Sequence, residues 1–161
     1  MASCTAPRDL AFPKSDTIVG IFVRLSVERT RHLWLRLGVA GDIQRAGRQR
    51  RGILEGTTSP EVFRQVRRNV TPQLLQWAGQ SWTDPLLRGH RCRLLVGFTR
   101  PDGCELRTRW EYGSESHEPP DEVREFVLSA VETTDPWYRE QWAAQNAPGH
   151  PGWRLLTPIG S

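Results

Sequence analysis

The sequence contains almost no lysine and almost no asparagine. Lys14 is the single lysine among 22 basic residues, and Asn69 and Asn146 are the only asparagines. Arginine in place of lysine, together with little asparagine, is typical of a GC-rich coding sequence, so we expect a bacterial protein. The net charge of +4 and the isoelectric point of about 9.5 would otherwise favour a nucleic-acid-binding protein. Because the composition has its own explanation, the basic excess is weak support for that function.

The motifs that bind nucleotides are absent as well. GxxxxGK[ST] needs a lysine after a glycine-rich loop, and Lys14 precedes the predicted folded region. GxGxxG does not occur either. The sequence therefore excludes a P-loop, and with it the nuclease and kinase-like sites that need a catalytic lysine. We predict no cofactor.

Cysteine and histidine are few and scattered. Cys4, Cys92 and Cys104 form no CxxC pair, which argues against a zinc site. An odd number of cysteines without a secretory leader predicts free thiols in a cytoplasmic protein. Acidic residues gather in 115–122, where a predicted helix N-terminus favours them through its dipole, so we predict no metal site. The histidines lie in four separate segments: His32, His90, His117 and His150.

Long apolar runs are also lacking. The longest apolar stretch, residues 18–27, is interrupted by Gly20, Arg24 and Ser26, which makes it too short and too polar to span a bilayer. Residues 1–16 contain no apolar segment of the kind that a signal peptide needs. We therefore expect no membrane association. The 161 residues, 37% of them hydrophobic, match one globular domain.

Two segments near the N-terminus alternate apolar and polar residues. Residues 21–27 and 33–39 place apolar side chains at every second position, a pattern typical of half-buried antiparallel strands. We predict a loop at 28–32 and a short third strand at 43–45. Residues 47–58 and 80–89 read as loops.

Residues 91–112 predict a β-hairpin. Pro-Asp-Gly at 101–103 forms a three-residue turn in which the glycine takes the position of positive φ. The resulting register places Cys92 opposite Tyr112 on the apolar face. It also keeps Cys92 far beyond disulfide reach of Cys104.

Helix-start signals occur at three places. Ser59 and Thr71 are each followed by proline, which combines a capping hydroxyl with a residue suited to the first turn. An apolar stripe that begins after Asp121 predicts an amphipathic helix. Thr-Asp-Pro at 134–136 predicts the end of that helix and the start of another short one.

These elements predict an α+β fold. The order ββ(β)-αα-ββ-αα favours an antiparallel sheet of four to five strands, made of two hairpins, with amphipathic helices packed on one face. We predict a flexible arm at 1–16, a single domain at 17–145 and an irregular Pro/Gly-rich tail at 146–161.

A nucleophile beside a base occurs only within one short segment. Ser114, Glu115, Ser116 and His117 are consecutive, whereas catalytic triads bring residues from distant segments together. We assign no catalytic residue. Folding can bring together two acids that are distant in sequence, so an enzyme with an unrecognised carboxylate or histidine site stays as an alternative.

Tryptophan is abundant, with seven in the chain. Exposed tryptophan and arginine are enriched at protein–protein hot spots, whereas buried rings would pin the C-terminal region onto the sheet. We predict a non-catalytic bacterial binding or adaptor module, immunity-type in character and a monomer or weak homodimer, whose partner is another protein. The predicted partner-binding residues are Trp34, Trp137, Tyr138 and Trp142.

The second alternative is a nucleic-acid-binding protein. An Arg-rich loop and one helix face supply the candidates Arg45, Arg48, Arg50, Arg51, Arg64, Arg67 and Arg68. The outward row of the hairpin adds Arg91, Arg93, Arg107 and Arg109. Glu105 and Glu111 share that row, so cross-strand ion pairs are the competing explanation.

Overall fold

The computed structural model describes residues 14–47 and 52–147 of the chain. The described part begins with a short 3-10 helix, η1 (Ser15–Thr17). Most of the predicted arm and tail lies outside these ranges, so the division into arm, domain and tail stays a prediction.

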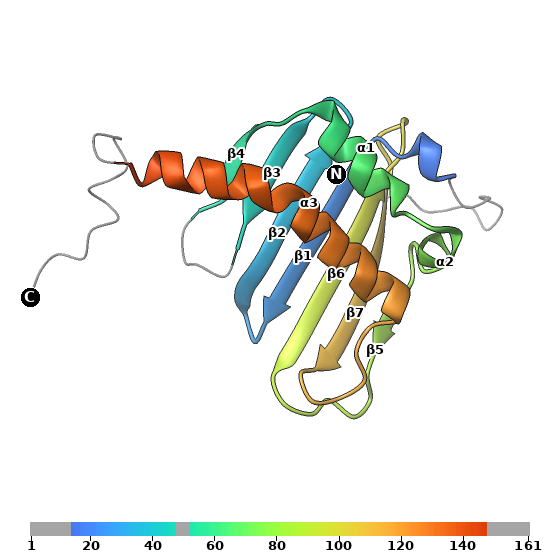
Figure 1. The fold of residues 1–161 in the computed structure, drawn as a ribbon. Helices are drawn as coiled ribbons and strands as arrows, with labels where there is room; N and C mark the ends of the chain where they lie inside the picture. Colours follow the sequence, from blue (N-terminus) through green and yellow to red (C-terminus); the bar gives the residue numbers. More distant parts are fainter. Residues whose placement is uncertain (1–13, 48–51, 148–161) are drawn as a thin grey trace, which may run out of the picture.

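A seven-stranded sheet is the main element of the described chain (Figure 1), with the order β4-β3-β2-β1-β6-β7-β5. The α+β class is confirmed. The sheet is nevertheless larger than the four to five strands predicted, and it is mixed because β5 runs parallel to β7. Its strands are β1 (Gly20–Val27), β2 (Thr30–Gly38), β3 (Asp42–Ala46), β4 (Leu54–Thr57), β5 (Ser81–Thr83), β6 (Arg91–Thr99) and β7 (Glu105–Gly113).

The hairpin of β6 and β7 has the predicted register. Cys92 pairs with Tyr112, and Gly103 in the connecting turn has a φ of +81°. Cys92 is a buried free thiol, and burial raises its pKa. The prediction of free thiols is wrong for Cys104, which is disulfide-bonded.

Two strands were missed because their sequences carry little alternation. β4 buries only Leu54, and all three residues of β5 are exposed. Both lie at the edges of the sheet. They form because neighbouring strands offer unpaired backbone groups, which is a tertiary effect that local pattern does not report.

The first hairpin is tighter than predicted. β2 begins at Thr30, so that Glu28 and Arg29 alone connect it to β1. Glu28 takes a positive φ of 51° there. The predicted third strand is confirmed and is slightly longer, as β3.

The helix starts at Ser59 and Thr71 are confirmed. Helix α1 (Pro60–Arg68) is capped by the Ser59 hydroxyl, which accepts from the Glu61 N–H at 3.2 Å. Helix α2 (Pro72–Leu75) is capped in the same way by Thr71.

The predicted break at 134–136 is wrong. Helix α3 (Asp121–Gln145) runs without interruption for 25 residues and contains Pro136. Trp137 and Thr134 on either side of the proline are buried, so tertiary packing holds this turn helical against the local preference.

The helices and the sheet form two layers. α1 and α3 cross one face of the sheet (Figure 1), and Val123, Phe126 and Ala130 of α3 are buried there. Alternate residues of β1, β2, β6 and β7 contribute to the same core. In the described part of the chain, no helix covers the opposite face, and no helix is long and apolar enough to cross a membrane.

Candidate functional site

Two of the predicted partner-binding aromatics have structural roles. The indole N–H of Trp137 donates to the Thr57 carbonyl at 3.0 Å, and the Tyr138 hydroxyl accepts from the Gly47 N–H at 3.1 Å. Trp142 is half-buried and packs against the core. The rings of Trp137 and Tyr138 thus attach α3 to the β3–β4 edge, which is the structural role that the sequence analysis gave as the competing explanation.

Arg45 lies in the interior rather than in the predicted loop. Its guanidinium donates to Asp135 at 2.9 Å and to the Thr134 hydroxyl at 3.2 Å, and it lies 4.9 Å from the centre of the Tyr138 ring. Burial lowers the pKa of Arg45, partly offset by Asp135. With 3% of its surface exposed, Arg45 contributes to no basic surface.

Three of the remaining arginines of the nucleic-acid alternative lie on α1, where each has a partner within the chain. Arg64 and Arg68 both pair with Glu61, at 2.7 and 3.5 Å. Arg67 lies over the Phe63 ring and donates to a backbone carbonyl of η1. Arg48, Arg50 and Arg51 lie outside the described residues.

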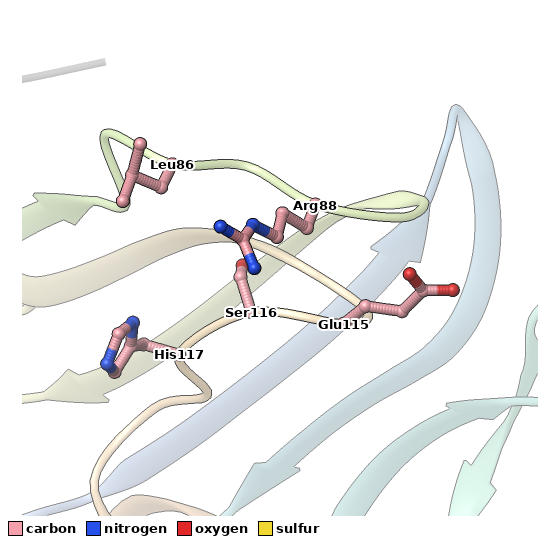
Figure 2. Close-up of a pocket in the computed structure, with 5 residues that line it drawn as sticks. All are labelled: Leu86, Arg88, Glu115, Ser116 and His117. Atoms are coloured by element: carbon pink, nitrogen blue, oxygen red, sulfur yellow. The ribbon is translucent and has the colours of Figure 1, made fainter.

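A pocket of about 340 Å³ forms beside the Ser-Glu-Ser-His segment. Figure 2 shows the Arg88 guanidinium turned toward Ser116, whereas Glu115 and His117 point away from it. The Ser116 hydroxyl accepts from the Gly113 N–H at 2.8 Å and also reaches the Gly113 carbonyl at 3.2 Å. This serine therefore closes a turn and has no histidine base beside it.

Asp84 is buried and interacts with two loops: the one that follows β5 and the Ser-Glu-Ser-His segment that follows β7. The carboxylate accepts from the Leu86 N–H at 2.9 Å. The Ser116 hydroxyl, then the Leu86 N–H, lower the pKa of Asp84, and His117 adds to this shift. These contacts connect the loop between β5 and β6 to the segment that follows β7.

A second site lies on the sheet face that no described helix covers. The outward side chains of β1, β2, β6 and β7 alternate with the core residues, and we name this surface the open face. It consists of Phe22, Arg24, Trp34, Arg36, Arg93, Leu95, Gly97, Glu105, Arg107, Arg109 and Glu111.

Strand register arranges the open face in rows that cross four strands. One row, from β2 to β7, reads Trp34, Arg24, Leu95 and Arg109, and the next reads Arg36, Phe22, Gly97 and Arg107. Four strands spaced about 4.8 Å apart span about 14 Å. This width suits contact with a partner surface.

Aromatic rings form the centre of the open face. Phe22 and Trp34 pack edge to face, with ring centres 5.0 Å apart. The guanidinium groups of Arg36 and Arg107 lie over the Phe22 ring at 5.5 and 5.6 Å. Because Gly97 lies between Phe22 and Arg107, no side chain blocks the approach of the arginine.

Two glutamates organise the arginines around this centre. Glu111 accepts from Arg93 at 2.9 Å and also from Arg109. Glu105 pairs with Arg107 at 3.2 Å and with Arg36 at 3.7 Å. Hydrogen bonding to Arg109, reinforced by Arg93, lowers the pKa of Glu111. The cross-strand pairing expected for this row is therefore present.

A hollow of about 260 Å³ borders the open face near the ends of β1 and β2. Phe22, Arg36 and Asp42 are among its lining residues. Gly38 makes room for Asp42, because a Cβ at position 38 would lie 2.1 Å from a carboxylate oxygen of that residue. The hollow is large enough to receive a side chain of a partner.

Sequence reasoning placed Trp34 and the hairpin arginines on an outer face but missed the residues of β1. Phe22 and Arg24 occupy the positions of this segment that alternate with the core residues. These positions are mostly polar, and Phe22 is the apolar exception. What the sequence did not show is that β1 pairs with β6, which joins the two hairpins into one surface.

Comparison of the chain with known protein families and structures identifies no relative. No family model, curated protein or solved structure matches this chain. Within residues 14–47 and 52–147, no group of three or more His, Cys, Asp or Glu side chains is arranged to hold a metal ion.

Proposed function

We propose that this protein is a non-catalytic binding protein that docks another protein on its open face, as an adaptor or immunity-type protein does. The observation that carries the proposal is Trp34, packed on the buried ring of Phe22 and surrounded by arginines, on a sheet face that no described helix covers. Tryptophan, phenylalanine and arginine are the residue types enriched at protein interfaces.

The contacts of the C-terminal aromatics support this location of the site. Trp137 and Tyr138 use their polar groups within the chain, so of the four aromatics predicted for binding, Trp34 is the one retained. Its indole N–H donates to Gln44 at 3.2 Å, which fixes the ring while part of it stays accessible.

Site-specific photo-crosslinking tests the proposal. Replacing Leu95 with benzoylphenylalanine places the crosslinker in the middle of the open face, and the same replacement at Leu128 places it on α3, where 61% of the residue surface is exposed. In host cells we expect a defined protein adduct from position 95 and none from position 128. Adding Trp34→Ala should abolish the adduct, because the aromatic centre is then lost.

Two results would contradict the proposal. One is an adduct from position 128 without one from position 95, which would move the interface to the helical layer. The other is an adduct of position 95 with nucleic acid alone, which would favour the nucleic-acid alternative on the same surface.

A further inference from the structure

We infer that the partner of the open face is acidic: a protein segment or surface rich in aspartate and glutamate. The inference rests on the proposed function and deepens it, because it names the chemistry that the face recognises. It is argued from the exposure, geometry and pairing of the charged groups on this face.

The exposed charge of the open face is mainly positive. The side chains of Arg36, Arg93, Arg107 and Arg109 are 49, 48, 55 and 45% exposed, whereas those of Glu105 and Glu111 are 19 and 8% exposed. The carboxylates therefore lie under the arginines. A partner that approaches this surface meets guanidinium groups before it meets the acids.

The two glutamates orient arginines for a further ligand. Each carboxylate holds two guanidinium groups, and a guanidinium has five N–H donors, so donors remain after each pair is made. Arginine held in this way retains little rotamer freedom to lose on binding. Its planar fork then fits a carboxylate of the partner with two parallel hydrogen bonds.

Arg24 differs from the other arginines of the open face because no acidic partner pairs with it among the described residues. Its register neighbours are Trp34 on β2 and Leu95 on β6, and it has no ion pair in the described part of the chain. The positive charge of Arg24 thus lies between an aromatic and an aliphatic side chain and has no carboxylate partner in the described chain. An acidic group of the partner would neutralise this charge. Its neighbours supply apolar contact around that ion pair.

Protein carboxylates fit this surface better than a nucleic-acid strand does. Single-stranded binding relies on bases that stack on exposed rings, but Phe22 is 4% exposed and lies beneath two guanidinium groups. Trp34 packs edge to face against it. The hollow beside Phe22 and Arg36 offers a place for a side chain of the partner instead.

Titration of the isotope-labelled full chain with short probes, followed by backbone NMR shifts, tests the inference. The probes are an oligoglutamate of about twelve residues, an oligolysine of the same length and a single-stranded oligothymidylate. We expect the oligoglutamate to shift the amides of β1, β6 and β7, and to lose affinity in about 0.3 M NaCl because screening weakens the ion pairs. Oligolysine should leave these amides unshifted.

Arg24→Glu and Arg68→Glu form a matched pair of variants. Both change the net charge equally, but Arg68 lies on α1 over the other face, with its side chain 70% exposed. We expect R24E to weaken oligoglutamate binding about fivefold to tenfold, as expected when an exposed ion pair becomes a repulsion. R68E should change it less than about twofold. Wild-type-like spectra of both variants show that folding is retained.

Three results would overturn the inference. Oligothymidylate that binds the open face more tightly than oligoglutamate would assign the surface to nucleic acid. Equal losses in R24E and R68E would show a response to net charge alone. A crosslinked partner at position 95 whose yield R24E leaves unchanged would retain the proposed function while rejecting an acidic partner. A wild-type chain that gave neither an adduct at position 95 nor oligoglutamate binding would reject both proposals.

Discussion

At the scale of single residues, similar side chains have opposite roles according to what surrounds them. Trp34 of β2 and Trp137 of α3 both lie against β-strands through hydrogen bonds of their indole N–H, yet Trp34 stays partly accessible and Trp137 is 8% exposed. The arginines divide in the same way, with Arg45 enclosed by α3 and Arg24 on the open face. Residue type predicted the chemistry of each group, but strand register and helix packing decided whether that chemistry faces a partner.

The difference between the tryptophans predicts unequal stability effects. Trp137→Ala removes a buried ring and its hydrogen bond to Thr57, so we expect the free energy of unfolding to fall by about 3–5 kcal/mol. Trp34→Ala should cost about 1–2 kcal/mol, because its ring already contacts water. Urea unfolding of both variants measures this, and equal losses would mean that Trp34 is a core residue and not an interface residue.

Glu111 predicts a pH dependence at the same scale. Its pKa lies below the ordinary value of 4.5, chiefly because Arg109 donates to the carboxylate and also because Arg93 does. The folded state therefore binds fewer protons than the unfolded state. The stabilisation of the folded state by the ionised Glu111 is therefore fully present above pH 4.5. It is lost as the pH falls through the lowered pKa of Glu111.

Glu111→Gln tests this dependence. We expect the variant to be less stable than wild type at pH 7 by about 1–2 kcal/mol, and this difference to shrink as the solution is acidified. Denaturant unfolding at a series of pH values follows both proteins. A difference that is independent of pH would show that the ion pairs of Glu111 contribute nothing to stability.

At the scale of elements, packing overrules local preference in α3. Thr-Asp-Pro at 134–136 has the composition of a helix boundary, but the helix continues because Thr134, Trp137 and Tyr138 all contact neighbouring elements. The Thr134 hydroxyl donates to the Ala130 carbonyl at 2.8 Å and accepts from Arg45. One continuous helix thereby crosses the sheet from the β7 side to the β3–β4 edge (Figure 1).

Pro136 consequently destabilises α3 locally, and the packing of its neighbours offsets this effect. Pro136→Ala restores a backbone N–H within α3, so we expect the free energy of unfolding to rise by about 1 kcal/mol. The proline is exposed, and the change therefore removes no core contact. A loss of more than about 1 kcal/mol in urea unfolding would contradict this, and would show that a proline kink is needed to seat Trp137.

At the scale of the whole molecule, one central pairing creates the candidate site. β1 pairs with β2 on one side and with β6 on the other, which joins both hairpins into a single sheet. The helices then cover one face, and the described chain leaves the aromatic and arginine residues of the other face without a helix. The proposed docking surface is a consequence of this two-layer arrangement.

This arrangement predicts how the purified full chain behaves. By size-exclusion chromatography with light scattering, we expect a monomer of about 18 kDa, the mass of one chain, without excess absorbance at 260 nm in low salt. An absorbance excess that disappears in high salt would contradict a protein partner and favour nucleic acid. A stable dimer would assign the open face to a second copy of the chain.

The sequence by itself determined the features that depend on neighbours along the chain. The caps at Ser59 and Thr71, the turn at Gly103 and the register of β6 with β7 all follow from local turn chemistry and from alternation that agree with each other. The α+β class followed from the order of these elements. Trp34 and the hairpin arginines could be placed on an outer face because a strand alternates its side chains.

Only the tertiary structure decided the features that depend on distant residues. It added the edge strands β4 and β5, kept α3 continuous through Pro136 and buried Arg45 against Asp135. It also brought Phe22 and Arg24 beside the hairpin, because β1 pairs with β6 across about 70 residues of sequence. Long-range pairing and burial are energies of the assembled chain, so a local pattern does not contain them.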